Sequence, residues 1–211
     1  MREMWFTVVA IVLLLGAAPA AAQTPSVAPA EAAAALALTP ADRILGKPDA
    51  PITIVEYASL TCPHCRHFTT DVLPKLKAKW IDTGKVKLVL RDYPLDEPAL
   101  RAAMVARCAP PERFYAFSET FFEAQEQWAT ARDYRAALER LAQFGGMTKN
   151  QFTACIADKK LEDQVIASRF AAGQKLSVTS TPSFFVNGTK FDGAPTAEAF
   201  DELLTRLAAK S

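Results

Sequence analysis

Two short apolar runs, separated by a longer helical stretch, set the pattern of the first half of the chain. The β-branched run from Ile52 to Val55 predicts a buried strand over residues 52–57. The composition from Pro63 onward predicts a helix to about Ile81, with a kink at Pro74. A second apolar run, from Val86 to Arg91, predicts the next strand. Strand, helix and strand in this order predict a parallel βαβ unit with a right-handed crossover.

The middle of the chain has helical periodicity and no strand pattern. One helix is predicted from Glu97 to Cys108, and three amphipathic stretches follow from Phe114 onward. Thr148 and Gln151 have the spacing of a capping box for the third, which should run through Cys155 toward Phe170. We expect a helical subdomain inserted at about residues 112–172. Its aromatic residues are expected in the core rather than along a peptide groove: Phe114, Phe117, Phe121 and Phe122.

The strand pattern returns near the C-terminus. Ser183 to Val186 and Thr189 to Phe191 predict two strands, and Asn187-Gly188 between them predicts a hairpin turn. A last helix, capped at Thr196, should bury Phe200, Leu203, Leu204 and Leu207. Strands on both sides of a helical insertion indicate an α/β fold.

The N-terminal residues form a separate segment. Residues 1–22 begin with a short region that contains Arg2, continue with an apolar core and end in small residues suited to a cleavage site. They are predicted to be a secretory signal peptide cleaved before Gln23. The alternative is an uncleaved anchor, but the apolar run is short for a bilayer span. Residues 23–41, rich in Ala and Pro, are expected to be a tether with a helical turn near Glu31 to Leu38, and residues 42–211 the folded domain. In both cases the domain would lie outside the cytoplasm.

Length and charge limit the possible functions. The chain has 211 residues, half of them apolar, which is enough for one domain with a full core. Its 24 Lys and Arg residues balance 23 Asp and Glu residues, for a net charge of +1. Neither the balance nor any basic run indicates a nucleic acid as partner.

The chemistry is concentrated in Cys62-Pro63-His64-Cys65, directly after the first strand. Cys62 falls at a helix N-terminus, where unpaired backbone N–H groups and the helix dipole favour a thiolate. In such settings the pKa of a cysteine falls from ~8.5 to roughly 3.5–7.5. Pro63 suits the first helical position, and His64 as an imidazolium would add positive charge. We interpret the pair as a redox disulfide with Cys65 as the resolving thiol, which needs no cofactor.

Two other classes of function are weighed against this one. Four side chains that could bind a metal ion lie within six consecutive positions: Cys62, His64, Cys65 and His67. Tetrahedral zinc normally takes ligands that converge from two segments, whereas neighbours on one helix point apart, and His67 is more simply a solvated helix residue. A redox-inert binding module is the third class, and the intact Cys-x-x-Cys motif argues against it.

These features together resemble the thioredoxin fold: a strand, a Cys-x-x-Cys helix, a strand, a helical insertion, and Thr181-Pro182 before a hairpin and a last helix. The Cys-Pro-His-Cys motif and the insertion are similar to its DsbA-like branch. The resemblance implies that Cys62 is the attacking cysteine and Cys65 its buried partner. It also implies that Glu56 is the buried acid beneath the site and that Pro182 is a cis-proline facing the thiols.

Glu56 and Pro182 also have physical interpretations of their own. Burial of Glu56 in an apolar strand would raise its pKa and suit it to exchange a proton with Cys65; the alternative is an exposed carboxylate on an edge strand. A cis bond before Pro182 could free the backbone of Thr181 to pair with an extended substrate peptide.

Thr181 bears on the direction of exchange. Within the resembling family, Thr at this position is more typical of isomerases and reductases than of the oxidase, which usually carries Val. Isomerases of this group dimerise through a separate N-terminal domain, for which residues 23–41 are too few. We therefore expect a monomeric oxidase, with a reductase or isomerase as the alternative.

The remaining cysteines are Cys108 and Cys155. Sequence alone allows three connectivities among four cysteines, and the redox pairing of Cys62 with Cys65 leaves these two for each other. In an exported protein a structural disulfide is favoured over two unpaired buried thiols, with a stabilisation of about 3–4 kcal/mol. It resembles a second disulfide of some DsbA-like proteins of α-proteobacteria.

The resemblance implies a complete cycle. The protein would donate the Cys62–Cys65 disulfide to reduced secreted proteins in the periplasm and leave reduced. A membrane quinone-linked oxidase of the DsbB type would then restore the disulfide.

Overall fold

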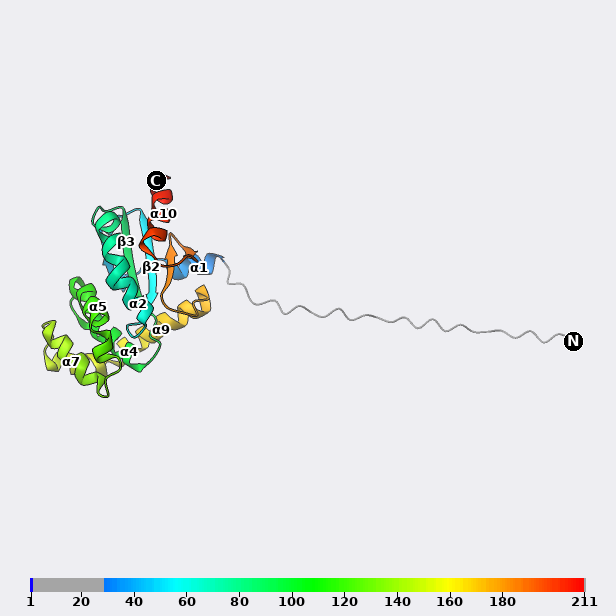
Figure 1. The fold of residues 1–211 in the computed structure, drawn as a ribbon. Helices are drawn as coiled ribbons and strands as arrows, with labels where there is room; N and C mark the ends of the chain where they lie inside the picture. The colour runs from blue at the N-terminus through cyan, green and yellow to red at the C-terminus, as the bar shows by residue number, and fades with distance from the viewer. Residues whose placement is uncertain (2–28, 211) are drawn as a thin grey trace.

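The computed structural model describes Met1 and residues 29–210. A five-stranded sheet forms its centre, with the order β1-β3-β2-β4-β5 (Figure 1). The strands are β1 Ile44–Leu45, β2 Ile52–Ala58, β3 Val86–Asp92, β4 Ser183–Val186 and β5 Thr189–Phe191. The predicted signal peptide, residues 1–22, lies outside the described residues except for Met1.

The predicted βαβ unit is confirmed. β2 and β3 pair in parallel from Ile52 opposite Val86 to Ala58 opposite Asp92. β4 pairs antiparallel with the other side of β2, and β5 with β4, so the Asn187-Gly188 hairpin is also confirmed. β1, only two residues long and antiparallel to β3, is an element that the sequence pattern did not predict.

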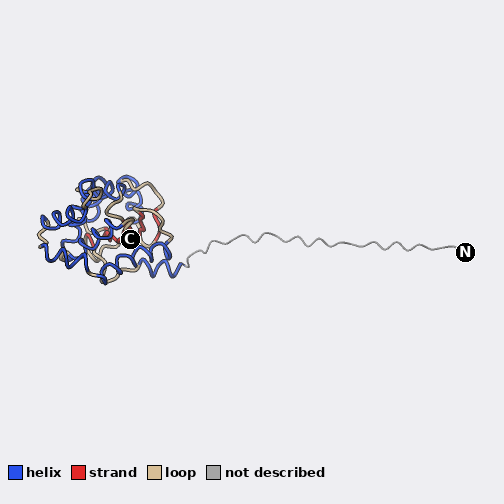
Figure 2. The backbone as a smooth tube through the Cα atoms, turned by 90° about the horizontal axis from the view of Figure 1, so that it is seen from below, coloured by secondary structure: helices blue, strands red, loops and turns tan. Residues whose placement is uncertain are grey.

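Successive residues of β2 point to opposite faces of the sheet and into separate hydrophobic clusters. Ile52 and Ile54 pack with Phe68 and Phe200, so the Cys-x-x-Cys helix and the last helix, α10 Ala197–Ala208, cover one face. Val55 packs on the other face, under α1 Pro29–Leu36 and α9 Lys159–Leu176. Figure 2 shows the strands enclosed between helices on both sides.

The helical segment predicted from Pro63 to Ile81 is present, but its hydrogen-bond pattern changes along its length. It consists of α2 Pro63–His67, the π-helical turn η1 Phe68–Val72, α3 Leu73–Leu76 and the π-helical turn η2 Lys77–Ile81. The first π-helical turn, η1, ends two residues before Pro74, which has no N–H to donate to an α-helical bond.

The helical insertion extends one end of the molecule and begins after α4 Glu97–Cys108 (Figure 1). The Thr148–Gln151 capping box is confirmed. The helix predicted to run from there toward Phe170 is divided at Asp158, which ends α8 and caps α9 through the Leu161 N–H. The further elements are η3 Pro111–Arg113, α5 Phe114–Glu123, α6 Gln125–Trp128, α7 Tyr134–Phe144 and α8 Lys149–Ala157.

The helical turn expected near Glu31 to Leu38 is present as α1, and the predicted tether is corrected for residues 29–41, because part of this segment packs on the domain. Leu36 of α1 is buried, and the carbonyls of Ala35 and Ala37 accept hydrogen bonds of 2.7 and 2.8 Å from the guanidinium of Arg91. Arg91, on β3, also forms an ion pair of 2.9 Å with Asp42. The folded unit therefore starts before Asp42, because a buried arginine needs these acceptors.

A helix able to cross a bilayer, by length and apolarity, does not occur in the part of the chain that the structure describes.

Candidate active site

The two thiols lie where β2 ends and α2 begins, the position that the Cys-x-x-Cys motif predicts. Cys62 is the N-cap of α2 in an extended conformation, and Pro63 holds the first helical position. The Cys62 N–H donates to the Ser59 carbonyl at 3.0 Å, and the Cys62 carbonyl accepts from Arg66 N–H at 3.1 Å. The backbone thus turns directly from strand into helix, with both sulfurs near the carboxyl end of a central strand.

The surroundings of Cys62 favour its ionised form. A hydrogen bond from the Cys65 thiol lowers the pKa of Cys62 most, while burial acts in the opposite direction. The side chain of Thr181 and the backbone N–H groups of Cys65 and His64 lower it further, to about 5. Since free cysteine titrates near ~8.5, Cys62 is a thiolate at neutral pH.

Cys65 is held in the opposite state. It is fully buried, and burial raises its pKa well above the ordinary value. Its hydrogen bond to Cys62 and the negative charges of Glu56 and Cys62 raise the pKa further, against a backbone hydrogen bond from Ser59. Cys62 is therefore ready to attack or leave as a thiolate, whereas Cys65 remains protonated until a base takes its proton.

Glu56 is 1 % exposed in the middle of β2, so the alternative of an exposed edge carboxylate is wrong. Burial, and then the charge of Cys62, raise its pKa to about 8. Its Oε1 atom is buried without a hydrogen-bond partner among the described residues. A neutral carboxyl beside Cys65 can give a proton to that sulfur or take one from it.

The Thr181-Pro182 segment reaches the thiols from far along the chain. The bond between these residues is cis. The Cys62 thiol donates to the Thr181 carbonyl at 3.3 Å, across 119 positions of sequence. Thr181 Oγ1 is buried and has no partner among the described residues, so its hydroxyl is available to the thiolate form of Cys62.

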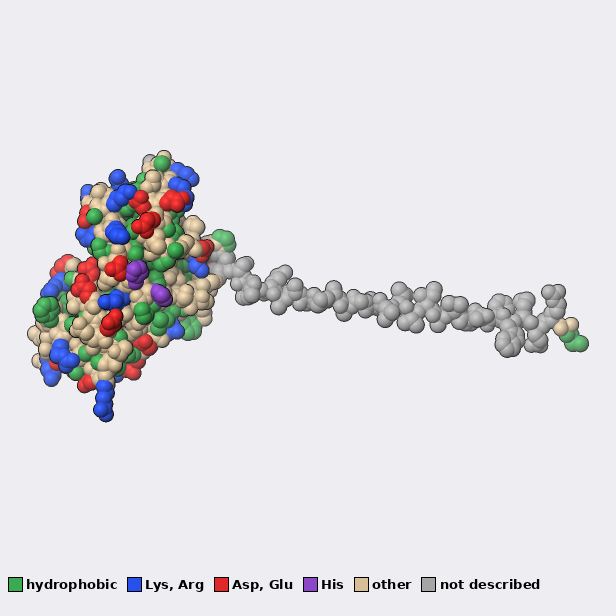
Figure 3. Space-filling view, in the orientation of Figure 1, with side chains coloured by type: hydrophobic (Ala, Val, Ile, Leu, Met, Phe, Trp, Pro, Cys, Tyr) green, Lys and Arg blue, Asp and Glu red, His purple; other side chains and the backbone are tan. Residues whose placement is uncertain are grey.

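The two histidines lie outside the buried site, and His67 is the solvated helix residue that the sequence analysis favoured. Both are exposed, and Figure 3 shows their side chains at the surface. His64 contributes to Cys62 through its backbone N–H, not through a positive ring. His67 Nδ1 lies 2.6 Å from Asp71 in an exposed pair. Within residues 29–210, no cluster of three or more His, Cys, Asp or Glu side chains is placed to hold a metal ion.

Gln125 is a site residue that the sequence analysis missed. It lies buried in α6, and its amide donates to the Leu60 and Cys62 carbonyls at 2.8 and 3.1 Å. The helical insertion thereby holds the backbone around the attacking cysteine. A glutamine within an otherwise exposed polar stretch gives no sequence signal of this contact.

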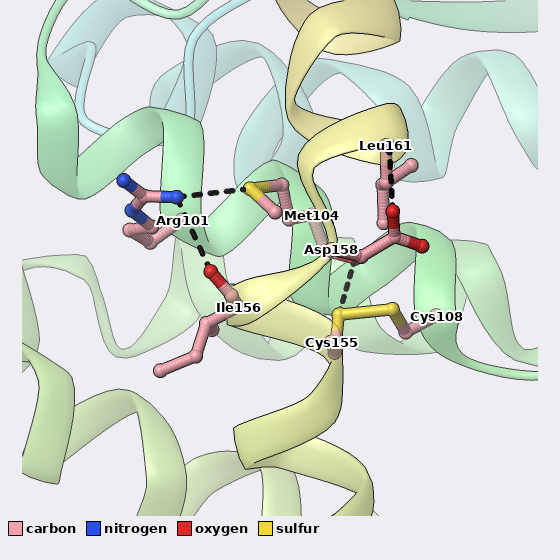
Figure 4. Close-up of a disulfide and its surroundings, with 7 residues drawn as sticks. All are labelled: Arg101, Met104, Cys108, Cys155, Ile156, Asp158 and Leu161. Carbon is pink, nitrogen blue, oxygen red and sulfur yellow. Dashed lines mark hydrogen bonds between the residues drawn. A yellow bond between two sulfur atoms is a disulfide. The ribbon is translucent and has the colours of Figure 1, made fainter.

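Cys108 and Cys155 form a disulfide between α4 and α8, so the alternative of two unpaired thiols does not hold (Figure 4). Arg101 lies beside it and donates to the Ile156 carbonyl at 3.3 Å, a second link between these helices. Cys155 is buried and Cys108 exposed. A cleft of about 400 Å³ opens beside this disulfide, away from the redox pair.

Comparisons with known proteins agree with this geometry. The thioredoxin family model matches residues 38–206. A Rickettsia bellii protein, whose name refers to protein-disulfide oxidoreductase activity, is 35 % identical over 150 residues, which cover 71 % of this chain and 58 % of the relative. Disulfide bond formation protein D of Bacillus subtilis is 30 % identical over 152 residues, which cover 68 % of this chain and 67 % of that protein.

Among solved structures, α-DsbA1 of Wolbachia pipientis matches with a TM-score of 0.79 and 35 % identity, covering 85 % of this chain and 96 % of that one. The fold and the paired thiols thus place the chain in the thioredoxin class, and it belongs to the DsbA-like family of thiol–disulfide oxidoreductases within that class. The chain spans a little over half the length of the Rickettsia relatives that it matches.

Proposed function

We propose that this protein is an exported thiol–disulfide oxidase that donates its Cys62–Cys65 disulfide to reduced secreted proteins. The observation that carries the proposal is the contrast between the two sulfurs: Cys62 has a pKa of about 5, whereas Cys65 is buried and has a raised pKa. A stabilised Cys62 thiolate favours the reduced form of the pair, and this makes the disulfide a strong oxidant.

The reaction transfers two electrons from the substrate in two exchange steps. A substrate thiolate attacks Cys62 Sγ, the Cys62–Cys65 bond breaks, and Cys65 leaves as a thiolate that takes a proton from Glu56. A second substrate thiolate then attacks the substrate sulfur of this mixed disulfide and displaces Cys62. Displacement is easy because the departing Cys62 thiolate is stabilised.

We further propose that the protein acts as a monomer in the periplasm after removal of residues 1–22. A membrane quinone-linked oxidase of the DsbB type would restore the disulfide. The relatives named for disulfide bond formation and the DsbA-like neighbours support this cycle.

The test is the reduction potential of the Cys62–Cys65 pair at equilibrium with glutathione, in a variant with Cys108 and Cys155 replaced by serine. We expect a potential much closer to the ~−120 mV of DsbA than to the ~−270 mV of thioredoxin. A value at or below that of thioredoxin would contradict an oxidase and favour the reductase that Thr181 suggested. Oxidation of a reduced peptide by the wild-type protein checks the direction independently.

A further inference from the structure

The buried pair of Cys65 and Glu56 needs a route for protons. In the proposed exchange, Cys65 gains a proton in one direction and loses one in the other. Both side chains are buried, with 0 % and 1 % exposure. Glu56 can therefore hold a proton for Cys65, but it cannot itself exchange that proton with bulk water.

A small cavity lies beside Glu56, on the side of the helical insertion. The space open to the centre of a water molecule is about 10 Å³, roughly enough for one water. It is closed by side chains of the Cys-x-x-Cys helical segment, of β3 and of α5. These are Thr69, Leu73, Leu88, Leu90, Tyr115, Ser118, Glu119 and Phe122, together with Glu56 from β2.

Two hydroxyl groups of α5 that line this cavity already form hydrogen bonds with the protein backbone. The Tyr115 hydroxyl lies 2.8 Å from the carbonyls of Arg43 and Leu88 and accepts from the Leu90 N–H at 3.1 Å. Ser118 donates to the Phe114 carbonyl at 2.9 Å. Burial also raises the pKa of Tyr115, so its hydroxyl stays neutral.

Glu119 is the second carboxyl that lines the cavity. It is half-buried, so it meets the cavity and also reaches solvent. Its side chain forms no hydrogen bond or ion pair with the residues that the structure describes. Burial and then the neighbouring Glu123 raise its pKa, and Lys77 lowers it, so this carboxyl takes up a proton more easily than an exposed glutamate.

We propose that Glu119 is the proton exchanger between Glu56 and solvent, acting through water in this cavity. The inference rests on thiol–disulfide exchange at Cys62 and Cys65 as proposed above. When Cys65 attacks a mixed disulfide on Cys62, its proton passes to the Glu56 carboxylate. From there it passes through water to Glu119 and into bulk solvent. The Cys65–Cys62 bond forms, and the bound thiol leaves as a thiolate. In the opposite direction the same groups return the proton.

The charged and titratable groups around this route come from several elements. Cys62 and Cys65 face Glu56 from the Cys-x-x-Cys helix, and the neutral Tyr115 faces it from α5. Around Glu119, the groups are Glu123 one turn further along α5 and Lys77 from η2, which is itself paired with Asp82. Glu123 is exposed and does not line the cavity, so it provides a matched control.

The test measures ring closure in the reduced full-length protein with its Cys108–Cys155 disulfide intact. Saturating glutathione disulfide forms the mixed disulfide on Cys62, and the first-order displacement of glutathione by Cys65 is followed by acid quench across pH. It is measured in light and in heavy water for wild type, Glu119→Gln, Glu119→Asp and Glu123→Gln.

In Glu119→Gln we expect closure to slow by about ten-fold or more, with a larger solvent isotope effect. The initial attack by Cys62 and the equilibrium potential should remain those of wild type, because a relay changes rates in both directions equally. Glu119→Asp should recover part of the rate. Glu123→Gln should keep the closure rate and the isotope effect of wild type, with only a shift in the pH profile, because Glu123 raises the pKa of Glu119. Equal closure rates and isotope effects in Glu119→Gln and Glu123→Gln would overturn the proposal. Failure of the wild type itself to close would instead count against thiol–disulfide exchange at this site.

Discussion

Replacing Glu56 with glutamine should make the protein more stable at alkaline pH and leave it nearly unchanged in acid. The pKa of this carboxyl rises from an ordinary value of 4.5 to about 8 in the folded protein. Between these values the folded wild type binds more protons than the unfolded chain, so its stability falls as pH rises. Glutamine resembles the protonated carboxyl and has no proton to lose.

The magnitude follows from the same two values. The gap between 4.5 and about 8 corresponds to about 5 kcal/mol at ~1.4 kcal/mol per pH unit. Part of that gap comes from the Cys62 thiolate, which is absent in the oxidised protein. We therefore expect a gain for Glu56→Gln of about 5 kcal/mol in the reduced protein and a smaller gain in the oxidised one, complete above pH 8.

The assay is urea denaturation of wild type and Glu56→Gln at a series of pH values, in both redox states. Glu123→Gln, which removes an exposed carboxylate, is the control and should follow wild type throughout. If the stability difference between Glu56→Gln and wild type does not change with pH, Glu56 is not held neutral, and the proposed proton donor for Cys65 is lost.

Three further predictions concern the disulfide, the residue before the cis-proline and the buried ion pair. Replacing Cys108 and Cys155 with serine should lower the free energy of unfolding by about 4 kcal/mol in the chain-entropy model; a loss near zero in urea denaturation would mean that the bond does not restrain the unfolded chain. Thr181→Val should raise the pKa of Cys62, since the side chain of Thr181 lowers it, and Thr181→Ser should not; ultraviolet titration of the thiolate decides, and equal values in the two variants would show that the hydroxyl plays no part. Asp42→Ala should cost about 3–5 kcal/mol, because it leaves a buried guanidinium at Arg91 without its carboxylate; a thermal unfolding midpoint like that of wild type would contradict this.

The parts of the fold that sequence predicted are those with local signals. The Asn187-Gly188 turn, the Thr148–Gln151 capping box and the β-branched run of β2 each depend on residues a few positions apart. Cys62 and Cys65 were found for the same reason, since four consecutive residues carry the motif.

The contacts that sequence reasoning missed depend on distant partners. The helical turn expected near Glu31 to Leu38 is present as α1, but its packing was missed, because it is held by a guanidinium that arrives from β3, 56 positions away at Arg91. Gln125 donates a hydrogen bond to the carbonyl of Leu60, 65 residues earlier, and no local sequence pattern predicts such a contact. The break at Asp158 did have a local signal, because aspartate caps the following helix, but the helical periodicity on both sides concealed it.

His64 shows why a motif does not define the role of every residue in it. The sequence analysis expected its imidazolium to stabilise the Cys62 thiolate, but the ring is exposed. The Cys65 thiol lowers the pKa of Cys62 most, and His64 contributes through its backbone N–H. A helix start supplies that N–H whatever the side chain, so the effect belongs to the backbone geometry.

The most direct test of the account is the titration of Cys62 in the reduced protein. Thiolate absorbance in the ultraviolet, measured against pH with Cys62→Ser as the baseline, reports this group because Cys65 stays protonated. The account predicts a pKa of about 5. A titration near ~8.5, as for free cysteine, would contradict it and remove the physical basis for a disulfide donor.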